Sequence, residues 1–364
     1  MLDLADSKYL LAIHRAMNLT SIRFRRLQGY FQSDWESAFN APAKKLMEAG
    51  IDSKGIEKLL RNRSNIVPER EVDQLRACGA SILILGKEKY PPSLAHIHNP
   101  PALLFYRGSY TGDEFPAIAV VGSRSISPTG QRSCTKLVTT LATAQITIVS
   151  GLAYGIDIQA HKISTKLHNK TIAVMANGID TVYPIAHENY VFQELRSGNL
   201  ILFSEYLPNT PAIPEMFPVR NRIVTGLSRA TIVVQAALRS GSLISAELAL
   251  DQNREVFAVP GDIFSPYSAG TNQLIANQKA MAVTSGEQIL SELGLVNIKT
   301  KKEAQRSFPL SESEKQLLSF LSESDPIHID TLSRQVKNAA SIITMLELKG
   351  LITDLGTNTY VKNI

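Results

Sequence analysis

Residues 117–124 read AIAVVGSR, and this stretch decides the fold. Its first five residues are all apolar and predict a strand buried on both faces, because a strand with one face in water alternates apolar and polar residues. Gly122 then ends the strand, and Ser123 can cap a following helix. A buried strand that leads through a glycine turn into a helix is typical of a parallel α/β sheet.

The same alternation continues along the chain. Further buried-strand candidates are residues 147–149, 171–175, 200–204, 231–235, 256–259 and 281–283. Amphipathic helix patterns separate most of them. The sequence therefore predicts an α/β protein with a Rossmann-like, doubly wound, mostly parallel sheet, in which ligands bind at the carboxyl ends of the strands.

Other regions of the chain lack this alternation. Residues 1–75 show helical periodicity and predict a small N-terminal helical domain ahead of the Rossmann-like domain, residues 76–293. Residues 294–307 are Lys-rich and predict a linker. Residues 308–364 have the pattern helix, short strand, helix, helix and hairpin, which is typical of a winged-helix domain.

Composition excludes several classes of protein. The chain has 364 residues, a net charge of +5 and 44% hydrophobic residues, which are ordinary values for a globular protein. Its apolar runs are shorter than the roughly 20 residues of a membrane span, and its low cysteine count suggests a reducing cytoplasm. Two cysteines are too few for a disulfide framework, and we expect both thiols to be buried and inert.

Two loops that follow predicted strands suit an anion. The first loop holds Gly122, Ser123 and Arg124, and the second holds Ser150, Gly151 and Gly155. Glycines let main-chain N–H groups approach an anion, and a guanidinium adds charge-assisted hydrogen bonds. The spacing is not G-x-G-x-x-G, and no acidic residue follows at the distance that a dinucleotide ribose requires, which argues against NAD.

Two further segments extend this candidate site. They contain Phe217, Arg220, Asn221 and Arg222, and then Ser240, Gly241 and Ser242. The two guanidinium groups and the Asn amide suit phosphate. Phe217 has two interpretations of equal weight: a platform on which a base stacks, or a hydrophobic staple for the following helix.

The candidate residues do not form an evident catalytic group. Asp157 and His161 stand four apart on one predicted helix face, and we interpret them as a local hydrogen-bonded pair that fixes the turn rather than as an acid–base pair. The loop at residues 177–184 has two open interpretations, a shape-setting turn or a ligand contact. We expect no metal site, because the His residues lack ligand spacing, and no ATP hydrolysis, because a P-loop motif is missing.

Taken together, these motifs resemble the DprA (Smf) family of DNA-processing proteins in order and spacing over about residues 80–290. The matching motifs are Gly122-Ser123-Arg124, Ser150 to Asp157 with Ala160-His161, Gly178-x-Asp180-x-x-Tyr183-Pro184, Ser204-Glu205, Phe217 to Ile223, Gly226-Leu227-Ser228, Ser240 to Leu243, Ala258 to Gly261 and Gly270 to Ile275. The N-terminal domain is similar to the sterile-alpha-motif-like (SAM-like) domain of that family. Gln235 and Gln278-Lys279 depart from the family pattern, which usually has an acidic residue and Gly-Ala there.

The resemblance implies a non-enzymatic protein that binds single-stranded DNA and loads the RecA recombinase during natural transformation. It also implies a homodimer formed through the Rossmann-like domain. From the residues themselves, we expect no catalytic residue, cofactor or metal. Arg124 and the segment from Phe217 to Arg222 would line the DNA pocket.

Two other functions remain open from the sequence. The first is a nucleotide-processing enzyme of the related phosphoribohydrolase group, although the Pro-Gly-Gly-x-Gly-Thr-x-x-Glu signature of that group is missing here. The second is a scaffold in which the pocket only stabilises the fold. The winged-helix segment has five basic against seven acidic residues, a net charge of −2, which is unfavourable for DNA. Its third helix, expected over residues 339–349, instead predicts a protein-contact surface of Ile342, Ile343, Met345 and Leu346.

Overall fold

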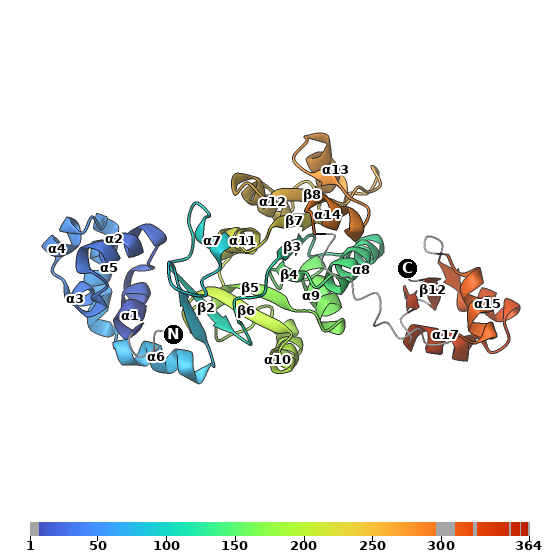
Figure 1. Cartoon of the computed structure of the whole chain (residues 1–364), viewed down its shortest axis with the longest axis horizontal. Coiled ribbons are helices and arrows are strands. Elements are labelled where there is room, and N and C mark those ends of the chain that lie inside the picture. The colour runs from blue at the N-terminus through green and yellow to red at the C-terminus, as the bar shows by residue number, and fades with distance from the viewer. Residues whose placement is uncertain (1–6, 296–309, 323–325, 349–350, 357, 363–364) are drawn as a thin grey trace. The chain divides into compact units, whose positions relative to one another are not determined.

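The computed structural model divides the chain into two compact units, residues 1–299 and 300–364, which we describe separately. The described residues are 7–295, 310–322, 326–348, 351–356 and 358–362 (Figure 1). All but the first two residues of the expected linker, 294–307, lie outside this set. The boundary expected after residue 75 falls within a helix, Pro68–Ala77, and remains a prediction.

Six helices open the first unit, and the expected helical character of this region is confirmed. They are α1 (Lys8–Met17), α2 (Ser21–Phe31), α3 (Trp35–Asn40), α4 (Ala43–Glu48), α5 (Ser53–Asn62) and α6 (Pro68–Ala77). Side-chain caps start several of them, as where Asp52 accepts a hydrogen bond from the Gly55 N–H at the start of α5. The helices contact the adjacent sheet through α1, where the His14 Nε2 lies 3.1 Å from the main-chain O of Glu205.

A nine-stranded sheet follows, with the order β1-β2-β6-β5-β4-β3-β7-β8-β9. The strands are β1 (Ser81–Ile84), β2 (Leu103–Arg107), β3 (Ala117–Val121), β4 (Thr147–Ser150), β5 (Thr171–Gly178), β6 (Leu200–Tyr206), β7 (Ala230–Val233), β8 (Glu255–Ala258) and β9 (Met281–Ala282). All neighbours pair in parallel except β1 with β2 and β2 with β6. The mostly parallel α/β fold is therefore confirmed.

Helices cover both faces of this sheet (Figure 1). They are α7 (Pro92–Ala95), α8 (Pro128–Thr143), α9 (Ile156–Lys166), α10 (Glu188–Ser197), α11 (Met216–Gly226), α12 (Gly241–Asp251), α13 (Ala269–Ala276) and α14 (Gly286–Glu292). The chain runs from β3 toward β6 and then crosses back to β7 on the other side of β3. Right-handed crossovers therefore place α8, α9 and α10 on one face and α12 on the other, with a topological switch point between β3 and β7.

Alternate residues of β3 belong to two separate apolar cores. Ile118 and Val120 pack in the core under α8 and α14, whereas Ala119 and Val121 pack in the core shared with the N-terminal helices. All four side chains are buried. This burial on both faces explains the unbroken apolar run at residues 117–121.

The second unit is a winged-helix domain, as expected. It contains α15 (Glu312–Phe320), β10 (Ile327–His328), α16 (Ile329–Gln335), α17 (Ala339–Leu348), β11 (Ile352–Asp354) and β12 (Thr359–Lys362). The three strands form an antiparallel sheet with the order β10-β12-β11. The apolar surface expected on α17 is smaller than the sequence predicted. Ile343 and Leu346 are buried and Ile342 packs against the core. Of the four expected residues, Met345 remains exposed, at 49%.

Candidate nucleic-acid interface

The loops after β3 and β4 pack directly against each other at the carboxyl edge of the sheet. The Ile156 N–H donates a 3.1 Å hydrogen bond to the main-chain O of Ser123. A Cβ on Gly122 would lie 2.5 Å from Cγ1 of Ile156, and Gly155 has a φ of +76° beside the same Ser123 oxygen. These two glycines therefore allow the two loops to pack closely. From the sequence, we expected the glycines to allow close approach of an anion instead.

Ser123 and Ser150 use their hydroxyl groups within the protein. Ser123 donates from Oγ to the main-chain O of Ser125 at 2.8 Å, and its N–H donates to the Gln235 main-chain O at 2.8 Å. Ser150 is fully buried and donates from Oγ to the Val120 O at 2.6 Å. Gln235 also binds Ser127, the N-cap of α8, through both side-chain atoms. Its amide therefore anchors the start of that helix.

Arg220 lies in the interior, contrary to the expectation of an accessible phosphate donor. It is 4% exposed, and its Nη1 donates hydrogen bonds to the main-chain oxygens of Gly151, at 2.6 Å, and Val174. A Cβ on Gly151 would lie 2.5 Å from its Nη2 and 2.8 Å from the Asp157 carboxylate. Burial lowers the pKa of Arg220 to about 10, so the guanidinium stays charged at neutral pH.

Asp157 fixes the turn after β4, but not through His161. Its carboxylate accepts hydrogen bonds from the N–H groups of Gly151, at 3.1 Å, and Ala153, at 3.4 Å, and burial raises its pKa. His161 is fully buried and its Nδ1 lies 2.7 Å from the Thr171 Oγ1, while burial lowers its pKa to about 3. The expected Asp157–His161 pair is therefore wrong, because the imidazole turns toward β5 instead.

Arg222 and Asn221 are also engaged within the protein. Arg222 donates from Nη2 to both carboxylate oxygens of Glu205, at 2.6 and 2.7 Å, and both side chains are largely buried. Asn221 accepts a 3.2 Å hydrogen bond from Nε of Arg220. The Arg222–Glu205 pair holds α11 to β6, and Arg220 holds it to Gly151 and to Val174 of β5, so the two arginines fix the middle of α11 against the sheet.

Two predicted site residues, Arg124 and Phe217, form an accessible cluster with Tyr183. The Arg124 guanidinium lies over the Phe217 ring, 5.5 Å from its centroid, and the side chain of Arg124 is exposed. The Tyr183 ring lies 5.7 Å from that of Phe217 and is 51% exposed. Phe217 is the second residue of α11, inside the helix, so it is not a hydrophobic staple, which requires a residue before the N-cap.

Two exposed aromatic residues, Tyr183 and Tyr154, were not predicted as site residues. Tyr183 belongs to the loop after β5, for which the sequence left ligand contact open, and the structure brings its ring to the Phe217 ring. Tyr154, 49% exposed, packs edge-on against His187 at 5.0 Å. The sequence signal for both was an aromatic residue in a glycine-containing loop at a strand end.

Ser240, Gly241 and Ser242 lie after β7, at the start of α12. Ser240 is the N-cap and accepts a 3.4 Å hydrogen bond from the Ser242 N–H. A Cβ on Gly241 would meet nothing within 4 Å, so open space lies beside it. Because β7 is paired with β3, this helix start lies at the same edge of the sheet as Arg124. Its contact with an anion remains a prediction.

The described ranges, 7–295 and parts of 310–362, contain no helix long and apolar enough to cross a membrane. They also contain no group of three His, Cys, Asp or Glu side chains placed to hold a metal ion.

Comparison with protein families assigns both units. A family model described as DNA recombination-mediator protein A matches residues 81–294, and one described as the DprA winged helix domain matches residues 301–356. The DNA processing protein DprA of Streptococcus pneumoniae is 43% identical over 203 residues, which are 56% of this chain and 71% of that protein. Protein Smf of Escherichia coli is 44% identical over 206 residues, which are 57% of this chain and 54% of that protein.

Solved structures give the same relationship. The X-ray structure of DprA from S. pneumoniae superimposes with a TM-score of 0.67 and 32% identity, and covers 78% of this chain and 97% of that one. A structure of DprA from Helicobacter pylori, described for its single-stranded DNA binding mode, has a TM-score of 0.53 and 30% identity, and covers 59% and 95% of the two chains.

Proposed function

The chain belongs to the DNA recombination-mediator protein A family, and we propose that it binds single-stranded DNA and acts as a recombination mediator rather than as an enzyme. One observation carries the proposal. The exposed Arg124 guanidinium lies over the Phe217 ring, next to the exposed Tyr183 ring, at the carboxyl edge of a parallel sheet. The H. pylori relative, whose structure is described as binding single-stranded DNA, supports this assignment.

The chemistry of these three side chains suits an unpaired strand. A guanidinium binds phosphate with charge-assisted hydrogen bonds, and every base has a flat face that stacks on an aromatic ring. Neither contact reads the edges of the bases. Binding is therefore expected to depend on salt and to vary little with sequence.

The family resemblance extends the proposal to partners. The mediator would load RecA onto the bound strand, and the chain would form a homodimer through its Rossmann-like unit. The loop between β8 and α13 supports such a contact, because it exposes Ile263 at 80% and Phe264 at 89%. Two large apolar side chains this exposed are expected to lie in an interface. Analytical ultracentrifugation of the Phe264→Ser variant tests whether this loop lies in the dimer interface. The variant is expected to dissociate, and a variant that remains fully dimeric would show that the loop is not part of the interface.

The enzyme alternative is disfavoured by the burial of the titratable groups. Asp157 is 7% exposed and His161 is fully buried, so neither can reach a nucleotide as acid or base. Oligonucleotide binding also tests the scaffold alternative, because a protein whose pocket only stabilises the fold would not bind oligonucleotides.

One paired assay separates the three functions. The intact chain is titrated with labelled oligo-dT and, in parallel, incubated with nucleoside monophosphates while release of free base is followed. The mediator binds oligo-dT and releases no base, and Arg124→Ala weakens this binding without lowering the melting temperature. Release of base would establish the enzyme, and failure of the folded chain to bind oligo-dT would leave the scaffold.

A further inference from the structure

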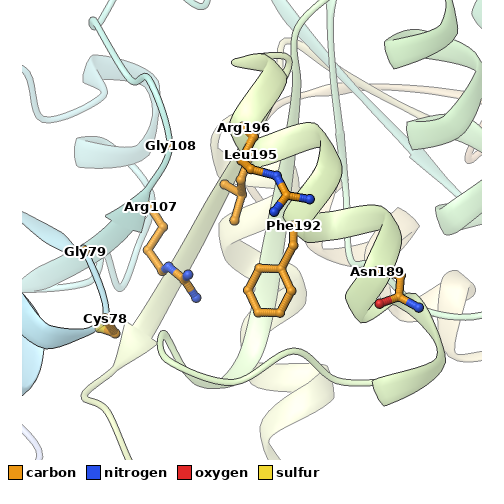
Figure 2. Close-up of a pocket in the computed structure, with 8 residues that line it drawn as sticks. All are labelled: Cys78, Gly79, Arg107, Gly108, Asn189, Phe192, Leu195 and Arg196. Atoms are coloured by element: carbon orange, nitrogen blue, oxygen red, sulfur yellow. The ribbon is translucent and has the colours of Figure 1, made fainter.

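A second concave site lies away from the Arg124–Phe217–Tyr183 cluster, between the end of α6, the end of β2 and one face of α10 (Figure 2). The cleft has a volume of about 440 Å³. Small-ligand sites span roughly 300–1,000 Å³, so this cleft is large enough to hold one. Its lining residues are Cys78, Gly79, Arg107, Gly108, Asn189, Phe192, Leu195 and Arg196.

The lining combines positive charge with an aromatic ring. The Arg107 guanidinium lies over the Phe192 ring, 5.7 Å from its centroid, and Arg196 is exposed. Figure 2 shows Arg107, Arg196 and Phe192 projecting into the same space. The eight lining residues include two guanidinium groups and no carboxylate. The charge of the cleft therefore favours an anion.

The wall formed by α10 is a single stripe of side chains. Asn189, Phe192 and Arg196 follow at spacings of three and four, which places them on the same helix face. The two acidic residues of α10 are not in the lining, and Glu194 is engaged by Ser197 at 3.0 Å. Across the cleft, Gly79 has open space where a Cβ would stand, which leaves room for a flat ring against Phe192.

One loop, residues 178–187, connects this cleft to the Arg124–Phe217–Tyr183 cluster. Near its start, the Asp180 main-chain O accepts a 3.4 Å hydrogen bond from Nη1 of Arg107. Three residues later, the Tyr183 ring contacts the ring of Phe217. An extended chain spans at most about 3.6 Å per residue, so the two sites lie within a few nucleotides of each other. Each site contains an arginine over a phenylalanine ring.

We propose that the cleft is a second subsite for the same single strand, in which a base stacks on Phe192 and a phosphate lies between Arg107 and Arg196. The inference rests on the proposed function and extends it, because a strand bound at Arg124 and Phe217 would continue over the 178–187 loop into the cleft. A peptide carboxylate would pair with the arginines alone, whereas a nucleotide also uses the ring and the open space beside Gly79.

The length dependence of oligo-dT binding tests the subsite. Affinity is measured for the intact wild-type chain and for Arg196→Gln and Phe192→Leu, with oligonucleotides from about 4 to about 24 nucleotides, which brackets common single-strand site sizes. Both variants are expected to bind the longest strands about fivefold or more weakly and the shortest bound strand as the wild type does. Arg196 is exposed, so its replacement is compatible with the native fold.

Two reference variants make the outcomes distinguishable. Arg229→Gln removes one exposed positive charge just before β7, at the opposite edge of the sheet, and is expected to change nothing at any length. Arg124→Gln is expected to weaken binding at every length. Suppose that Arg124→Gln weakens binding at every length. If Arg196→Gln and Phe192→Leu then bind like wild type, or lose the same affinity at all lengths, the subsite is wrong and the proposed function stands. If the wild-type chain binds no oligo-dT, both fail.

Discussion

Arg220 shows how a motif residue can serve the fold. Its guanidinium donates hydrogen bonds to the Gly151 and Val174 main-chain oxygens, and its positive charge stabilises the buried Asp157 carboxylate. Arg124, in contrast, is exposed and has a ring beneath it. Two arginines of the same motif set therefore have different environments, and we propose that Arg124, not Arg220, contacts the ligand.

Replacing Arg220 by Met is expected to lower the free energy of unfolding by about 3–5 kcal/mol, because it leaves a buried carboxylate without its nearest cation and two carbonyl groups without donors. Urea unfolding measures the change. The exposed Arg229→Met serves as the control and should stay within about 0.5 kcal/mol of wild type. A stable Arg220→Met protein that has lost DNA affinity would return Arg220 to the role of phosphate donor.

Replacing Phe217 by Ala is expected to weaken single-strand binding by about 1–3 kcal/mol, because a stacking surface is lost. The ring contacts Tyr183 and Arg124 at the surface, so little core packing changes. Fluorescence anisotropy gives the affinity, and a thermal melt of the same sample gives the stability. A lower melting temperature with unchanged affinity of the folded fraction would show that Phe217 only supports α11.

At the scale of elements, the strands of the parallel sheet were predictable and β2 was not. A run such as residues 117–121 is apolar throughout because both of its faces are covered, and this signal is local. Residues 103–107 read LLFYR and are apolar at four of five positions, but Pro100 and Pro101 just before them predict an extended connector. The structure pairs them antiparallel with β1 and with β6, whose residues lie about a hundred positions away. Pairing with distant segments decides short strands of this kind.

Part of the candidate site was predictable from the sequence and part was not. Arg124 was proposed because it directly follows a strand, where ligands bind in such sheets, and Phe217 because it stands beside two arginines in the sequence. The burial of Arg220 could not be predicted, because it depends on the carbonyl groups of Gly151, just after β4, and of Val174 in β5, which only the folded sheet places beside α11. Tyr183 reaches Phe217 through the path of a loop, which sequence does not specify.

Within the winged-helix unit, α17 offers little to a nucleic acid. Residues 308–364 have a net charge of −2, and Met345 is the exposed large hydrophobic side chain that α17 presents within its described part. Deletion of residues 308–364 is therefore expected to leave single-stranded DNA affinity within about threefold, or ~0.7 kcal/mol. Titration of the stable 1–307 fragment measures this, and a tenfold or larger loss would assign DNA contact to the winged helix.

At the scale of the whole molecule, buried histidines make the stability of the first unit sensitive to acid. Burial lowers the pKa of His14 to about 4, and its Nδ1 accepts a 3.2 Å hydrogen bond from the Leu19 N–H, so the native state needs the neutral ring. The unfolded state binds the proton from about pH 6.5 downward. The stabilisation is therefore complete above about pH 6.5 and is lost as pH falls toward about 4.

For His14 alone, this shift corresponds to about 3 kcal/mol of unfolding free energy over that range. Urea unfolding at several pH values between about 7 and about 4 measures it, mostly above the range in which carboxyl groups take up protons. The His14→Gln variant is the control and should show a shallower pH dependence. Equal pH dependence in both proteins would show that the buried imidazole is not the group that titrates.

We propose that the chain binds a single strand through phosphate contacts at the carboxyl edge of its sheet, with Arg124 as a direct contact. The most direct measurement is the salt dependence of oligo-dT affinity for the intact wild-type chain, Arg124→Gln and the control Arg229→Gln. Each phosphate contact adds about 0.7 to the slope of log affinity against log salt for a single strand. We predict a steep slope for wild type and the control, and a slope smaller by about 0.7 for Arg124→Gln. A flat wild-type response, or identical slopes in all three proteins, would contradict the claim.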